Sequence, residues 1–235
     1  MAAYDLQEQE QMSNLKAWWE RYGNLVCALA VGVAVAGLGW QGWQWYQRKQ
    51  ATEAAVLMDQ VVQGALERDA QKVKQISGDL IARYPSTVQA AMSGLVAARF
   101  SVENKDLKSA HAQLQWVAEH SSDAGMRDIG RVRLAYVMAD ENQLDEALKQ
   151  VQTESTVAFA PRFAEARGDI LLLQNKLPEA AKAYEQALSS LKESGAETDG
   201  LKPYQEMLKA KLDAVGGGSV SPVTVEAKPA AGAAK

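Results

Sequence analysis

The chain of 235 residues is poor in the side chains that build disulfides, metal sites and catalytic centres. Its one cysteine, Cys27, lies in an apolar stretch, so the remainder has no disulfide and no thiol nucleophile. The two histidines, His111 and His120, are nine residues apart, a spacing that does not bring two imidazoles to one zinc ion on a helix. We therefore expect no metal and no cofactor.

Catalytic motifs are also missing. The sequence has no glycine-rich phosphate loop, no paired carboxylates in an apolar setting and no Ser/His/Asp order. The net charge is −4, and no basic stripe is present that would neutralise phosphates, which argues against nucleic acid as a ligand. We expect a protein that is not an enzyme and that binds other proteins.

Aromatic residues are few, at 7%, whereas 47% of the residues are hydrophobic, a composition that favours helices. One run, LVCALAVGVAVAGLGWQGWQW at residues 25–45, has no charge and reaches about 31 Å as a helix, the thickness of a bilayer core. Tryptophan and tyrosine gather at both of its ends, where amphipathic rings lie among lipid headgroups. These features predict a transmembrane helix at 25–46 after a short segment, 1–24.

A cleaved signal peptide and a buried core helix are the alternatives to this span. A signal peptide has a short basic start and a shorter apolar run, whereas here the first 24 residues contain four acids. Basic residues flank the run equally on both sides, so charge does not orient it. Ala28, Gly32 and Ala36 put small side chains on one face, a pattern that lets a partner helix pack closely.

A repeat fills the rest of the chain. Residues 142–147, NQLDEA, and 175–180, NKLPEA, lie 33 residues apart, and Ala135 and Gly168 precede their alanines by the same interval. The small residues at Gly168 and Ala180 permit a close helix crossing, which Tyr184 fills. The order of small, aromatic and alanine positions resembles the tetratricopeptide signature.

Weaker copies lie upstream, one built on Ala98 and Ala110 and a degenerate one on Val61 and Val73. We predict an all-α fold: one N-terminal transmembrane helix, then a tetratricopeptide-like α-solenoid at 47–214. The solenoid comprises about four helix pairs and a capping helix, at 53–84, 87–120, 124–153, 159–191 and 202–214. The glycine-rich and Pro/Ala-rich tail, 215–235, is expected to be disordered.

The opening YDLQEQEQMSNLKAWWERYGN, the single span with its Gly/Trp-rich end and the degenerate repeats together resemble the YfgM-type family of ancillary Sec-translocon subunits. The resemblance extends to about residue 214 and includes RGDILL at 167–172. It implies a bacterial inner-membrane protein with a cytoplasmic N-terminus and a periplasmic repeat domain. It also implies three kinds of partner: the Sec translocon (SecYEG), the membrane-anchored periplasmic chaperone PpiD, and client polypeptides.

The first helix of each repeat in such a solenoid lines an open concave face. Aligning the repeats on Ala98, Ala135 and Gly168 places eight side chains there as candidate partner-binding residues. They are Met92, Leu95, Arg99, Val132, Tyr136, Arg162, Glu165 and Asp169. A cell-envelope scaffold or assembly protein without a translocon link is the alternative function.

Overall fold

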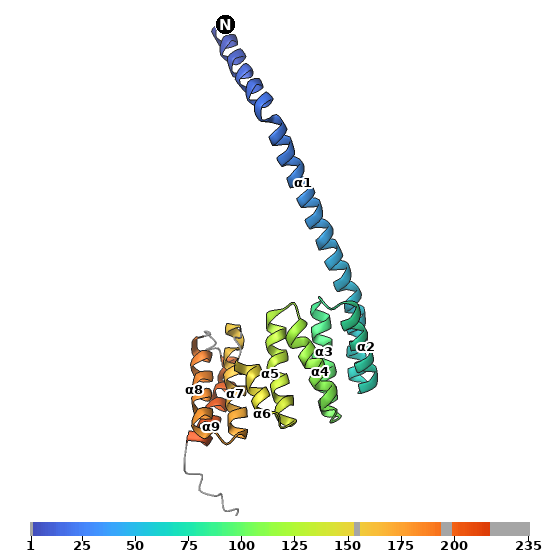
Figure 1. The fold of residues 1–235 in the computed structure, drawn as a ribbon, viewed down its shortest axis with the longest axis vertical. Helices are drawn as coiled ribbons and strands as arrows, with labels where there is room; N and C mark the ends of the chain where they lie inside the picture. The colour runs from blue at the N-terminus through green and yellow to red at the C-terminus, as the bar shows by residue number, and fades with distance from the viewer. Residues whose placement is uncertain (1, 153–155, 194–198, 217–235) are drawn as a thin grey trace, which may run out of the picture. The chain divides into compact units, whose positions relative to one another are not determined.

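A computed structural model of the chain describes residues 2–152, 156–193 and 199–216. All regular structure in these residues is helical, which confirms the all-α expectation (Figure 1). The α-helices are α1 (Ala2–Leu66), α2 (Ala70–Arg83), α3 (Val88–Glu103), α4 (Leu107–His120), α5 (Ala124–Asp140), α6 (Leu144–Gln152), α7 (Ala160–Leu173), α8 (Leu177–Glu193) and α9 (Lys202–Gly216). Two short 3-10 helices, η1 (Val157–Phe159) and η2 (Asp199–Leu201), precede α7 and α9. Of the tail predicted at 215–235, the part from residue 217 lies outside the described residues.

Helix α1 is continuous, whereas the sequence pattern predicts a separate span and a separate first repeat helix. No proline interrupts its residues, so nothing breaks the backbone hydrogen-bond ladder between residue 46 and the repeats. The chain nevertheless forms two compact units, and the boundary between them lies within α1, between Glu53 and Ala54. Among the described residues, one helix is long and apolar enough to cross a membrane, the stretch Trp18–Leu66 of α1.

The second unit repeats one turn between the helices of each pair. At each turn a single residue adopts a left-handed backbone conformation, with φ between 56° and 62°. The next N–H donates to the carbonyl five residues earlier and so satisfies a free carbonyl at the helix end. The left-handed residues are Arg68, Lys105, Asn142 and Asn175. They lie five residues before Val73, Ala110, Ala147 and Ala180, all of which are wholly buried. The turns therefore have the same register as the sequence repeat.

Small residues allow the helices to cross closely. A Cβ atom added at Gly168 would lie 2.5 Å from Cε1 of Tyr184, the side chain that fills this crossing from α8. A Cβ atom at Gly130 of α5 would lie 2.9 Å from the backbone nitrogen of Ala118 in α4. Backbone cannot rotate away as a side chain can, so the crossing at Gly130 is the more constrained. The sequence repeat pointed to Gly168 and missed Gly130.

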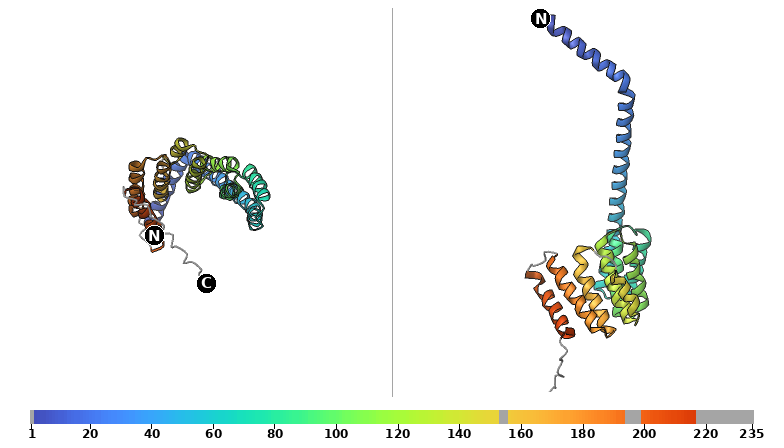
Figure 2. Two further views of the ribbon diagram at one scale, coloured as in Figure 1. Left: turned by 90° about the horizontal axis from the view of Figure 1, so that it is seen from below. Right: turned by 60° about the vertical axis from the view of Figure 1, so that its left-hand side comes forward.

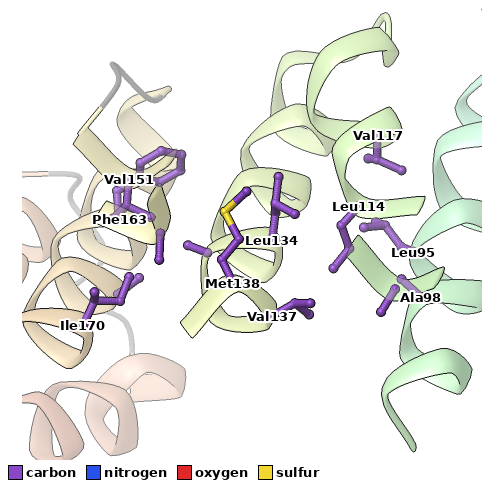
Figure 3. Close-up of a cluster of buried hydrophobic side chains, with 14 of the residues drawn as sticks. Leu95, Ala98, Leu114, Val117, Leu134, Val137, Met138, Val151, Phe163 and Ile170 are labelled. Carbon is purple, nitrogen blue, oxygen red and sulfur yellow. The ribbon is translucent and has the colours of Figure 1, made fainter. Parts of the chain in front are cut away.

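Apolar side chains from successive pairs form one core through the middle of the second unit (Figure 3). Leu114, Leu134, Phe163 and Ile170 of this core are at most 2% exposed. Each helix from α2 to α9 contacts the next one along the chain. The last helix, α9, closes the series: its Leu208 is wholly buried among residues of α7 and α8. The helix thus covers an apolar face that the final repeat would otherwise expose.

Candidate functional site

The first helices of successive pairs lie along the inside of an arc of helix pairs (Figure 2). Besides contacting its own partner helix, α3 contacts α5, and α5 contacts α7. The faces of α3, α5 and α7 on this inner side are called the concave surface below. All eight candidate partner-binding residues belong to these three helices. They fall into an open group on α3 and α5 and a covered group on α7.

Part of the open group borders a hollow between α3 and α5, called the groove below. Its volume is about 370 Å³. Three predicted residues line it: Leu95 from its floor, and Arg99 and Tyr136 from its rim. Met92, 41% exposed, and Val132, partly buried against the core, lie on the same helices but do not line the groove.

Seven further residues line the groove: Ala98, Val102, Glu103, Leu114, Arg133, Val137 and Asp140. The sequence alignment missed the charged members of this set. Glu103 lies one helical turn after Arg99, and Arg133 lies one turn before Tyr136, so helical periodicity applied to the predicted residues would have found both. Arg99 donates to Glu103 across 2.8 Å.

The covered group lies beneath α9. Glu165, predicted to lie on the open concave face, is on this face but is only 4% exposed, because α9 covers it. Its carboxylate accepts hydrogen bonds from Tyr204 and Lys211 of α9, each at 2.8 Å, and from Arg162 at 3.1 Å. The Arg162 guanidinium also stacks over the ring of Tyr204 at 3.9 Å. A buried carboxylate that accepts from three donors forms a specific polar contact between α7 and α9.

Asp169 joins this contact to the groove. It accepts from Tyr136 of the groove rim, from Tyr184 of α8 and from Lys211 of α9, each at 2.8 Å. Burial, followed by the nearby carboxylates, raises the pKa of Tyr136 well above its ordinary value. Burial lowers the pKa of Lys211, but its hydrogen bonds and ion pairs with Asp169 and Glu165 outweigh that effect and raise the pKa overall. The lysine therefore stays charged and the tyrosine neutral at physiological pH.

Comparison with known proteins agrees with the architecture. The family described as a tetratricopeptide repeat-like domain matches residues 16–217. A relative from Neisseria gonorrhoeae, named "Ancillary SecYEG translocon subunit", is 30% identical over 92% of this chain and 100% of its own length. Relatives with the same name from Haemophilus influenzae and Escherichia coli are 28% and 27% identical, over 90% and 88% of this chain and 98% and 95% of theirs.

The chain belongs to the family of ancillary SecYEG translocon subunits. The resemblance stated from the sequence is thereby confirmed. No solved structure matches the chain significantly. The family is named for a translocon subunit and not for an enzymatic activity.

The N-terminal helix of this family member fits a single-pass protein of the inner membrane. Large apolar side chains along its span are exposed, among them Leu29, Val33 and Trp40, each 67% exposed, as expected of a surface that contacts lipid. Gly32 has open space around it. The role of Ala28, Gly32 and Ala36 in packing against another helix stays a prediction.

Proposed function

We propose that the chain is a membrane-anchored interaction protein, an ancillary subunit of SecYEG that links emerging polypeptides to periplasmic chaperones through its repeat domain. The observation that carries this proposal is an open groove on the concave surface of a repeat domain that continues from a membrane-length helix. The names of the relatives point to SecYEG as the membrane complex that a protein with such an anchor would join. PpiD and client polypeptides are the proposed ligands of the concave surface.

This function requires a specific topology. We propose that residues 1–24 are cytoplasmic, that 25–46 span the inner membrane, and that 47–214 lie in the periplasm, where chaperones and emerging chains meet. Alkaline phosphatase fused after Leu212 would then be active, and a cytoplasmic reporter fused there would be silent. The opposite pattern would exclude a periplasmic chaperone as a partner.

Co-purification tests the translocon link. The full chain, extracted from its own membranes in a gentle detergent, is expected to bring down the SecYEG subunits and PpiD. Recovery of copies of itself alone would instead support the cell-envelope scaffold. A control chain in which the span is replaced by an unrelated apolar helix would show whether the anchor or the repeat domain makes the contact.

A further inference from the structure

The groove between α3 and α5 carries charges of both signs on its rim. Arg99 and Arg133 come first along their helices, and Glu103 and Asp140 come later. The separation is four residues on α3 and seven on α5, which at about 1.5 Å per residue gives about 6 Å and about 10 Å along the helix axes. The rim is therefore polarised along the groove, with arginines toward one end and carboxylates toward the other.

Two charges that α5 contributes to the groove rim, Arg133 and Asp140, have no partner within the described part of the chain. Arg99 is paired with Glu103, whereas Arg133 makes no hydrogen bond or ion pair there, and neither does Asp140. The pKa of Arg133 is lowered, first by partial burial and then by the like charge of Arg99. A carboxylate placed beside Arg133 would relieve that repulsion and supply the missing acceptor.

Between these charges the floor is apolar and tightly packed. Leu95, Ala98, Leu114 and Val137 are each no more than 8% exposed, so the floor belongs to the core and does not depend on a ligand for its order. Val102 offers an exposed apolar side chain at its edge. An apolar centre within a charged rim is the usual composition of a protein-binding surface.

We propose that this groove binds an amphipathic helical segment of a partner polypeptide whose apolar side chains lie between an acidic residue at Arg133 and a basic residue at Asp140. This inference rests on the proposed function, because it names the chemistry of what the concave surface recognises. Helix positions i and i+7 are about 10 Å apart, the separation of the two free charges, and positions i+3 and i+4 lie between them on the same face. The preferred segment therefore has an acid, two large apolar residues and a base at i, i+3, i+4 and i+7.

A double-mutant cycle with a synthetic peptide tests this assignment. The probe is an acetylated, amidated and fluorescently labelled helical peptide that contains Glu-Ala-Ala-Leu-Leu-Ala-Ala-Lys, titrated with the full chain in detergent micelles. Replacing the peptide's glutamate by glutamine is expected to weaken binding about two- to fivefold, the upper part of the range for an exposed ion pair. Arg133→Gln in the protein should weaken it equally, and the two changes together no further than either alone.

Matched variants give the cycle its controls. Arg83→Gln removes an exposed arginine outside the groove and should leave binding unchanged, while Asp140→Asn should couple to the peptide lysine. An unfolding midpoint equal to that of the wild type, followed by circular dichroism, would show that each variant is folded. The proposal would be overturned if the losses of affinity from the peptide change and from Arg133→Gln were additive. It would also be overturned if Arg83→Gln weakened binding as much as Arg133→Gln does. Binding that appears only after removal of residues 217–235 would also overturn it, because the chain's own tail would then be the occupant.

The same variants separate this inference from the proposed function. If the peptide shows no coupling to Arg133 while the chain still co-purifies with SecYEG and PpiD, the charge assignment is wrong and the translocon role stands. If co-purification fails, the proposed function is wrong whatever the peptide does.

Discussion

Among single residues, Glu165 is the polar side chain that fixes the C-terminal helix, α9, against α7. It is buried and accepts from Arg162, Tyr204 and Lys211. Replacing it by alanine removes the acceptor of Tyr204 and leaves Lys211 with Asp169 alone, both in a partly buried setting. The residue therefore has a structural role on the concave surface, whatever it contributes to binding.

We expect Glu165→Ala to destabilise the repeat domain by about 1 to 3 kcal/mol, because it removes a buried acceptor of three hydrogen bonds between partly buried groups. Glu185→Ala removes an exposed glutamate of α8 and should stay within about 0.5 kcal/mol of the wild type. Urea unfolding of a fragment beginning at residue 54 measures both. Equal midpoints for the two variants would mean that α9 does not depend on this carboxylate.

The tyrosines around Glu165 and Asp169 make a prediction about alkaline pH. Burial, followed by the hydrogen bonds to these carboxylates, raises the pKa of Tyr184 and Tyr204 far above 10.0, the ordinary value for tyrosine. Above pH 10 the unfolded chain loses tyrosine protons that the folded chain keeps, so the free energy of unfolding should fall as the pH rises.

The matched variant is Tyr204→Phe, which removes one of these hydroxyls and keeps the ring that stacks against Arg162. It should be less stable than the wild type at pH 8 and should lose less of its remaining stability between pH 8 and 11. Urea midpoints at the two pH values measure the difference. An equal loss in both proteins would show that this hydroxyl does not titrate with folding.

At the scale of helices, the close crossings decide the register of the repeats. Gly130→Ala and Gly168→Leu should each destabilise the domain by about 1 to 3 kcal/mol, because the added atoms overlap packed neighbours. Ala180→Leu, at a wholly buried position, should do the same. Gly78 in α2 is the matched control: a Cβ there meets nothing within 4 Å, so Gly78→Ala should stabilise by about 0.5 to 1 kcal/mol. A midpoint of thermal unfolding for Gly130→Ala equal to that of the wild type would contradict this packing.

The helix register could be predicted from the sequence because close crossings impose small residues at a fixed interval, as at Ala147 and Ala180. The contact between α7 and α9 could not. Glu165 and Tyr204 meet across 39 positions of the chain, and such a polar pair leaves no periodic signal. The turns were predictable only in part, because Asn142 and Asn175 are typical left-handed residues, whereas Arg68 and Lys105 are not.

For the whole chain, a role at the membrane requires an anchor that stays attached. The uncharged run and its flanking aromatic residues predict that the mature protein retains Met1 and leaves the membrane only with detergent. Intact-mass measurement on membrane-derived protein checks this. A species beginning near Ala51 would show that the run is a cleaved leader.

If the protein has the proposed function, its concave surface contacts proteins that pass through or serve the translocon. Photocrosslinking in intact cells tests this contact, with the crosslinker placed at Met92 or Arg99 on the concave surface and at the exposed Ala112 of α4 as the control. We expect crosslinks to PpiD, SecYEG subunits or newly exported chains from the first two positions and none from Ala112. Equal capture from Ala112, or no capture of these partners from Met92 and Arg99, would contradict it.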